Sequence, residues 1–381
     1  MQGTGVLKKL ADYSIRRHYP ELKNADERYL KFFAAVCQSQ TRLVSRWMNI
    51  GFIHGVMNTD NVTISGETID YGPCAFMDYY DQKTVFSSID VAGRYCYGNQ
   101  PAILVWNLSK LAEALIPLID DEEQKSIEKL TEVLQLVMPS YEKYFYSEMG
   151  KKLGIDPISQ NNMNLIKDYL KILDSNSIDF TLSFRDLSKI LKKTKSIEDS
   201  VFKNTGDFKK WTENWIIKII SEKTNLKDIT KKMDLTNPCY IPRNHIIEDA
   251  LKNAINDDMT LIKEILQLYK NPFEENEDFE EDHANVSLAA MESSLKPQVL
   301  KTLKKIADAY SKLSSLQNNR MLAAIKEKKA FSENEEKKYQ NLILKEILVL
   351  VMLDGQLTVN QVKLMLIHIL LRKFQSYIME L

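Results

Sequence analysis

A chain of 381 residues with 44% apolar and 27% charged residues can bury a sizeable core, which excludes a largely disordered protein. Its 12 Gly and 10 Pro are few for this length and predict a mainly α protein with long helices. The formal net charge of -1 provides no overall field for nucleic acid or for an anionic membrane, so neither is expected as a partner.

The cysteines and the apolar runs indicate in which cellular compartment the protein is expected. The four cysteines are widely spaced and include no Cys-x-x-Cys pair, which predicts neither a zinc site nor a disulfide framework and favours a reducing, intracellular compartment. The first residues contain no apolar signal region. The most apolar run, Leu342–Leu353, is interrupted by Lys345 and Glu346 and is shorter than the roughly 20 residues that cross a bilayer, so no transmembrane segment is expected.

Two helices are predicted ahead of residue 54. From Val6 to His18 apolar residues recur at helical spacing, until Pro20 interrupts the pattern. Asn24 and Glu27 are spaced as an N-cap pair and predict the start of a long helix that leads to residue 54.

The sequence period changes from helical to alternating at residue 62. Val62–Ser65 and Glu67–Asp70 alternate apolar and polar residues around a single glycine, which predicts two short strands joined by a tight turn. Antiparallel strands lie about 5 Å apart, so a hairpin keeps its ends close together. Asp60 and Asn61, just before the hairpin, are therefore expected near Asp70, at its end.

These three side chains carry the oxygen ligands that Mg²⁺ prefers. Magnesium usually takes one or two carboxylates together with substrate phosphates. Taken separately, Asp60–Asn61 can be a turn or helix cap, and Asp70–Gly72 is a common turn tripeptide. Their combination with His54 favours a site for a metal ion and a nucleotide.

The segment His54–Asn61 has the spacing of a protein kinase catalytic loop. That loop reads His-Arg-Asp-x-x-x-x-Asn, with the Asp as base and the Asn on a metal ion, and Asp-Phe-Gly follows it. Here Asp-Tyr-Gly stands in place of Asp-Phe-Gly, but Val56 occupies the position of the base. An aliphatic side chain cannot accept a proton, so phosphorylation through Val56 is excluded. Asp60 is the nearby carboxylate able to replace the base.

The motifs resemble those of the selenoprotein O family of kinase-like protein adenylyltransferases, which are pseudokinases. The resemblance is continuous from about residue 5 to residue 120, thins beyond it, and returns near residues 237–244 and 271–273. It is carried by LADY (10–13), RHYP (17–20), HGVMNTDN (54–61), TIDYGP (68–73), GRY (93–95), NQP (99–101), WNL (106–108), NP (237–238), RN (243–244) and NPF (271–273).

This resemblance implies a kinase-like C-terminal lobe that transfers AMP from ATP to Ser, Thr or Tyr hydroxyls of proteins, with pyrophosphate leaving. It implies that Asp60 accepts the hydroxyl proton, that Asn61 binds magnesium, and that Asp70 binds magnesium and also contacts ATP. By comparison with kinases, His54 is expected to brace the loop through hydrogen bonds. ATP and hydroxyl-bearing proteins are the implied partners.

Asp90 and Arg94 follow at the distance of an activation segment. Asp90 is a candidate for ordering the catalytic loop through backbone N–H groups, and Arg94 for contacting phosphate or a substrate carboxylate. Alternatively, the two side chains pair within the fold. The next segment, Leu104–Leu118, is predicted to be a buried helix of the lobe.

Further helices are predicted between residues 121 and 270. They are Ile127–Val137, Tyr141–Leu153, Asn162–Leu173, Phe184–Leu191 and Phe208–Ile220. The basic run Lys189–Lys203 is interpreted as a solvated helix face. Arg243 receives no role from its spacing.

An acidic segment divides the chain. We predict a kinase-like lobe with its helical extension over residues 1–273, an acidic linker over 274–296 and a bundle of three amphipathic helices over 297–381. Without any single diagnostic motif, the bundle resembles the BAG-type co-chaperone bundle, which binds a heat-shock chaperone, and it is expected to bind a helical partner. The second hypothesis is therefore a catalytically inactive kinase-like scaffold or co-chaperone-type interaction protein.

The resemblance also implies a nucleotide-binding lobe ahead of the catalytic loop. Only 53 residues precede His54, and they contain no glycine-rich loop. The sequence is therefore interpreted as the C-terminal lobe of a truncated adenylyltransferase. Its ATP binding is expected to be weak, since each charge-assisted hydrogen bond contributes about 1.5–3 kcal/mol. Eukaryotic members of the family are often mitochondrial, although no targeting peptide is visible here.

Overall fold

The structure is a computed structural model that describes residues 2–155, 159–203, 205–221 and 225–276, with a few isolated positions between 304 and 318. Contacts between Cα atoms divide the chain into one unit of residues 1–287 and a second of residues 288–381. Apart from those isolated positions, the predicted bundle over 297–381 lies outside the described residues. So does the predicted linker after residue 276.

The described part of the first unit is mainly helical, as the sequence predicted. Its α-helices are α1 (Gln2–His18), α2 (Arg28–Ile50), α3 (Gln100–Ile119), α4 (Glu123–Gln135), α5 (Val137–Leu153), α6 (Gln160–Ser175), α7 (Phe180–Leu191), α8 (Gly206–Ser221), α9 (Leu226–Thr236), α10 (Asn244–Ile255) and α11 (Thr260–Lys270). Short 3₁₀ turns occur at η1 (Pro20–Leu22), η2 (Thr59–Asn61) and η3 (Tyr97–Asn99), and the strands are β1 (Phe52–Ile53) and β2 (Ala75–Phe76).

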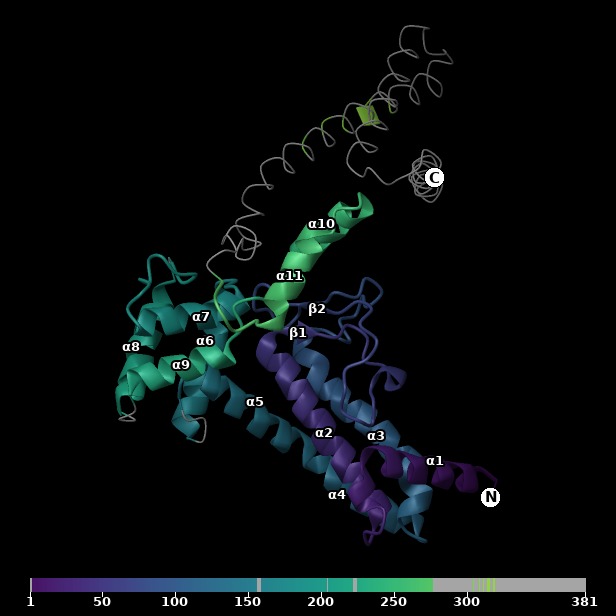
Figure 1. Cartoon of the computed structure of the whole chain (residues 1–381). Helices are drawn as coiled ribbons and strands as arrows, with labels where there is room; N and C mark the ends of the chain where they lie inside the picture. The colour runs from purple at the N-terminus through teal and green to yellow at the C-terminus, as the bar shows by residue number, and fades with distance from the viewer. Residues whose placement is uncertain are drawn as a thin grey trace, which may run out of the picture. The chain divides into compact units, whose positions relative to one another are not determined.

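Helix α2 is the centre of the core. Its apolar residues recur every three or four positions, so one stripe of the helix is buried, including Phe33, Val36 and Val44. The helix packs against α3, α4 and α5, which lie around it in Figure 1. It begins at Arg28 after Glu27, whose φ of 50° is left-handed, and no side-chain cap is formed. The predicted N-cap by Asn24 is therefore wrong, because η1 and the turn after it occupy these residues.

Helices α6 to α9 form a second group beside α5 (Figure 1). Their interior is aromatic: the rings of Trp211 and Trp215 stack with centroids 5.6 Å apart. Each indole N–H also has a partner, because Trp211 donates to the carbonyl of Leu165 at 2.9 Å and Trp215 to that of Leu153 at 2.8 Å. Large aromatic side chains with satisfied polar atoms give this group a fixed packing.

Helix α3 is the one helix in the described part of the chain that is long and apolar enough to cross a membrane (Tyr97–Ile119, mean hydropathy 1.5). Its buried side chains, among them Leu104 and Leu108, face a core shared with α2 and α4. On its outer face Lys110 pairs with Glu113 at 2.7 Å. We interpret α3 as the buried helix that the sequence predicted over Leu104–Leu118.

The basic run on α7 and the turn after it is part of the fold. Lys189 pairs with Glu275 at 3.1 Å, Lys192 with Asp234, and Lys195 with Asp186 at 2.7 Å. These three lysines are partly exposed, as a solvated face requires, and each is also neutralised by a carboxylate from α7, α9 or the segment after α11. The start of the predicted acidic linker is held on the body, since Glu275 also pairs with Arg185 at 2.9 Å.

Arg243 joins two distant segments through a buried ion-pair cluster. Its guanidinium, 2% exposed, pairs with Asp78, just after β2, and lies 2.8 Å from Asp179, the N-cap of α7. Burial acts to lower the pKa of Arg243, but Asp179 and Asp78 outweigh burial and raise that pKa. The cluster fixes the chain leaving β2 against α7.

Lys152 on α5 is a buried lysine in an aromatic environment. Its side-chain nitrogen lies 4.1 Å from the ring centroid of Phe184 and 5.6 Å from that of Phe180. Burial lowers the pKa of Lys152 from 10.5 to about 7, against an opposite effect of Glu148. The ammonium form is therefore unfavourable in the folded protein, although the ring faces offset part of that cost.

We expect Lys152→Met to raise the free energy of unfolding by roughly 2–4 kcal/mol at about pH 6. At that pH Lys152 is protonated in both the folded and the unfolded chain, so the folded parent bears the full cost of burying the charge. Between pH 7 and 10.5 the unfolded chain binds more protons than the folded one, so the parent gains stability as pH rises. The advantage of the variant should therefore shrink across this window. Urea unfolding of both proteins at several pH values measures the difference.

Lys171, exposed on α6, provides a matched control, because Lys171→Met makes the same chemical change outside the core. Its unfolding profile should run parallel to that of the parent at every pH. A Lys152→Met profile that is also parallel would contradict the assignment of a depressed pKa to Lys152.

Candidate metal and nucleotide site

The predicted catalytic segment forms a loop closed by the two strands of the fold. Strands β1 and β2 pair in antiparallel fashion, with Phe52 opposite Phe76 and Ile53 opposite Ala75. Residues 54–74, called here the site loop, connect them. The loop contains His54, Asp60, Asn61 and Asp70, so the fold brings both motifs of the sequence into one closed segment.

The predicted hairpin over Val62–Ser65 and Glu67–Asp70 is reduced to a single antiparallel bridge between Val62 and Thr68. The prediction of two paired strands is therefore wrong, because these segments share only this one bridge. The physical reason is that other groups take their backbone hydrogen bonds. Gln40 donates to the carbonyl of Thr63, for example, and the Thr63 hydroxyl donates to the carbonyl of Glu67 at 2.8 Å.

Side chains from α2 and from Tyr19 hold the tip of the site loop. Tyr19 donates to the carbonyl of Ile64 at 2.6 Å, and Ser39 donates to that of Ser65 at 3.3 Å. Gly66 at the tip has φ +78°, and a Cβ there would lie 1.9 Å from the Ser39 hydroxyl oxygen. Only glycine fits this close approach, and α2 therefore determines where the tip lies.

His54 braces the loop from inside, the role expected from the sequence. It is fully buried, with its ring 5.4 Å from that of Trp47. The tautomer with hydrogen on Nε2 satisfies both neighbours: Nε2 donates to the carbonyl of Ile69 at 2.8 Å, and Nδ1 accepts from the backbone N–H of Val56 at 3.4 Å. The side chain thus joins the first turn of the loop to the residue before Asp70.

Two polar residues on α3 fix the loop from its other side. Gln100, fully buried, accepts from the His54 backbone N–H at 3.0 Å and donates to the carbonyl of Phe52 at 3.0 Å. Asn107 donates to the carbonyl of Met57 at 2.9 Å. Sequence reasoning quoted both residues as part of the resemblance but gave them no role. The available signal was two amide side chains seven residues apart, on one face of an apolar helix.

The three candidate site residues lie at the two ends of the bridge. Asp60 and Asn61 belong to η2, just before Val62, and Asp70 follows the bridge. Asn61 donates its amide N–H to the carbonyl of Val56 at 3.1 Å, which leaves its amide oxygen as the free acceptor. Within the described residues, no hydrogen bond or ion pair to protein engages the exposed carboxylate of Asp60 or of Asp70.

Asp70 adopts a left-handed backbone conformation with φ 56°. Non-glycine residues rarely occupy this region, and Asp and Asn occupy it most readily. Such a conformation persists where surrounding contacts impose it, and it is frequent at functional sites. Here the bond from His54 to Ile69 fixes the preceding residue.

This donor set fits a hard divalent cation that is also bound by phosphates. The described residues contain no cluster of three or more His, Cys, Asp or Glu side chains arranged for a metal ion, so a fully protein-coordinated site is not formed there. The Asp70 carboxylate and the Asn61 amide oxygen are a smaller set, of the kind that magnesium uses when nucleotide phosphates complete its shell. Asn61 and Asp70 are therefore the candidate magnesium ligands of this loop, and the carboxylate of Asp60 lies beside Asn61.

Asp90 and Arg94 lie on a turn that contacts the site loop. The Asp90 carboxylate accepts from the backbone N–H groups of Arg94 at 2.8 Å and Tyr95 at 2.7 Å. The Tyr95 hydroxyl then donates to Asn58, the N-cap of η2. Asp90 thus orders its own turn and reaches the loop through Tyr95. The Arg94 guanidinium is exposed and stacks 4.6 Å from the ring of Trp106.

Comparison with known proteins gives consistent matches over the same region. The family model described as Protein adenylyltransferase SelO matches residues 1–270. The curated protein named Protein nucleotidyltransferase YdiU from Cereibacter sphaeroides is 45% identical over 274 residues, and the one from Bacillus cereus is 42% identical over 276 residues. Each match covers 72% of this chain and 56% of the relative, so the chain spans just over half the length of these relatives.

Proposed function

We propose, from the premise that this chain belongs to the SelO family of protein adenylyltransferases, that its site loop serves transfer of AMP from ATP to Ser, Thr or Tyr hydroxyls of other proteins. The observation that carries the proposal is the pair of exposed, unengaged carboxylates at the two ends of one braced loop. The lobe that holds them is proposed to be kinase-like. Its bound magnesium would neutralise charge that develops on the phosphates.

The proposed reaction is a displacement at the α-phosphorus of ATP. The substrate hydroxyl oxygen forms a bond to that phosphorus, while the bond from the phosphorus to the oxygen bridging the β-phosphate breaks. Pyrophosphate leaves with that oxygen, and the hydroxyl proton passes to a carboxylate of the protein. The products are a phosphodiester-linked AMP on the substrate and free pyrophosphate.

Asp60 is the residue proposed to accept the proton. Its carboxylate is exposed and sits beside Asn61 in η2, so a substrate hydroxyl can approach it from solvent. Asn61 and Asp70 are proposed to hold the magnesium ion, and Asp70 to contact the nucleotide. Val56 occupies the position of the base that kinases use for phosphorylation. We therefore propose nucleotidyl rather than phosphoryl transfer.

The test distinguishes which part of ATP is transferred. The 381-residue chain is incubated with a protein mixture, Mg²⁺ and ATP that carries radiolabel on the α- or on the γ-phosphate. We expect protein-bound label from α-labelled ATP and none from γ-labelled ATP.

Label from the γ-phosphate would replace adenylyl transfer with phosphorylation. Absence of both labels, with the chain folded, would contradict the proposal and favour the scaffold hypothesis. Mass spectrometry of the labelled protein identifies the acceptor, and an AMP mass on a residue without a hydroxyl would contradict the proposed substrate class.

A further inference from the structure

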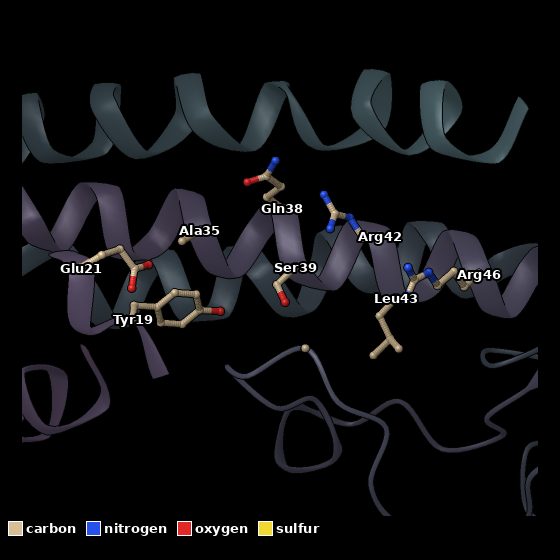
Figure 2. Close-up of a pocket in the computed structure, with 9 residues that line it drawn as sticks. Tyr19, Glu21, Ala35, Gln38, Ser39, Arg42, Leu43 and Arg46 are labelled. Carbon is tan, nitrogen blue, oxygen red and sulfur yellow. The ribbon is translucent and has the colours of Figure 1, made fainter. Parts of the chain in front are cut away.

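A polar groove runs along α2 beside the tip of the site loop. It has a volume of about 350 Å³ and is separate from the candidate ligands, none of which lines it. Helix α2 contributes Gln38, Arg42 and Arg46, and Glu21 and Gly66 line it from other segments. Figure 2 shows these α2 side chains along the helix, with Glu21 nearer its N-terminal end.

The groove carries unbalanced positive charge at one end. Arg42 and Arg46 are exposed and one helical turn apart, a spacing at which like charges repel. Across the described residues neither guanidinium pairs with a carboxylate. Arg42 lies over the ring of Tyr144, 5.5 Å from its centroid, and hydrogen bonding by Gln38, followed by Arg42, lowers the pKa of that tyrosine. The two guanidinium groups at this end of the groove can therefore bind an anionic ligand.

The dimensions of the groove suit a short extended peptide. Its α2 wall runs from Ala35 to Arg46, which at 1.5 Å per residue is about 16 Å. An extended chain rises about 3.3 Å per residue, so about five residues span this length. The walls are mostly polar, which disfavours an apolar ligand. Guanidinium groups bind carboxylates with two parallel hydrogen bonds, and acidic side chains therefore fit Arg42 and Arg46.

Two residues that line the groove form hydrogen bonds to the site loop. Ser39 and Tyr19, which line it, bond to the backbone of residues 65 and 64 in the site loop. The bridge between Val62 and Thr68 separates that tip from Asp60 and Asp70. A peptide in the groove would therefore lie along α2 and touch Gly66 at the tip of the loop that carries the proposed reacting groups.

We propose that this groove binds a short acidic segment of the protein that is modified, with its carboxylates on Arg42 and Arg46. Identification of the bound protein as a substrate rests on the proposed function. The binding itself rests on the groove alone. Glu21 at the opposite end sets the direction, because it repels carboxylates there and favours a basic or hydroxyl-bearing residue of the same segment.

The test measures binding without ATP. A fluorescent peptide with a run of glutamates is titrated with the full chain, and its anisotropy is compared with that of a peptide in which glutamines replace the glutamates. We expect the double variant Arg42→Glu, Arg46→Glu to weaken binding of the glutamate peptide by about tenfold or more. Added salt should weaken binding to the parent, and neither protein should bind the glutamine peptide.

A matched control reverses the same charge elsewhere. Lys231 and Lys232 are exposed on α9, and Lys231→Glu with Lys232→Glu should leave peptide binding unchanged. Equal loss in this control would show an effect of net charge and would overturn the proposal. Equal binding by the parent and the Arg42→Glu, Arg46→Glu variant would also overturn it. So would displacement of the peptide by inorganic phosphate at matched concentration, which would indicate a small-anion site.

The labelling reaction separates the two proposals. If α-phosphate label appears and is unaffected by Arg42→Glu with Arg46→Glu, the groove proposal fails while the proposed function stands. If no label appears but the glutamate peptide binds with the expected dependence on both arginines, the docking site stands and the transfer activity fails.

Discussion

The Asp70→Asn variant should lose about a hundredfold or more of its α-phosphate labelling, because metal-based charge stabilisation is worth several kcal/mol and about 1.4 kcal/mol is tenfold in rate. Asparagine tolerates the left-handed conformation of residue 70, so the fold should be retained. The measurement is the initial rate of labelling by α-labelled ATP. Circular dichroism and thermal unfolding verify that the variant is folded.

Two further variants serve as a control and as a comparison for Asp70→Asn. Asp121→Asn makes the same change at an exposed aspartate outside the site loop and should label at the parental rate. The Asp60→Asn variant lacks the proposed proton acceptor, so its labelling rate should fall by about 10²–10⁴-fold. It should keep the rise in melting temperature that Mg²⁺ and ATP produce. Asp70→Asn should lose that rise as well. Parental labelling by Asp70→Asn would remove Asp70 from the proposed site.

Replacement of Arg243 by Met should lower the free energy of unfolding by about 3–5 kcal/mol, because it leaves two largely buried carboxylates without their cation. Urea unfolding near neutral pH measures this loss. Lys192→Met breaks the ion pair with Asp234 at the surface, and it should cost less than about 1 kcal/mol. Similar losses in the two variants would contradict the buried-charge argument.

A compensated variant separates lost charge from lost packing. Asp78→Asn and Asp179→Asn, combined with Arg243→Met, remove all three charges, and asparagine still caps α7. Most of the lost stability should return in this triple variant. Stability that stays as low as in Arg243→Met alone would indicate that the packing of the guanidinium, rather than its charge, holds the cluster.

Helices α1 to α8 could be predicted because their signals are local, whereas α9, α10 and α11 were not predicted. Apolar residues at helical spacing indicated α1, α2, α3 and α5 to within a few residues, except at the start of α2. There the spacing of Asn24 and Glu27 suggested a cap, but η1 and a left-handed Glu27 form the turn instead. Boundaries of this kind depend on backbone choices that spacing does not determine.

The candidate site was only partly predictable. His54, Asp60, Asn61 and Asp70 could be found from motif spacing, and the structure places them in one closed loop. The hairpin was predicted from alternation alone, and alternation does not reveal that α2 side chains bond to its carbonyls. Similarly, no local pattern indicates that Arg243 reaches Asp78, because that contact joins residues 165 positions apart.

The bracing of residues 54–74 by two helices has a thermodynamic consequence. Fixing the backbone of one residue costs about 1–2 kcal/mol of conformational entropy. Contacts from Gln100, Asn107 and the α2 side chains fix several loop residues while the chain folds. A nucleotide that arrives later does not have to order this segment, so more of its interaction energy remains for affinity.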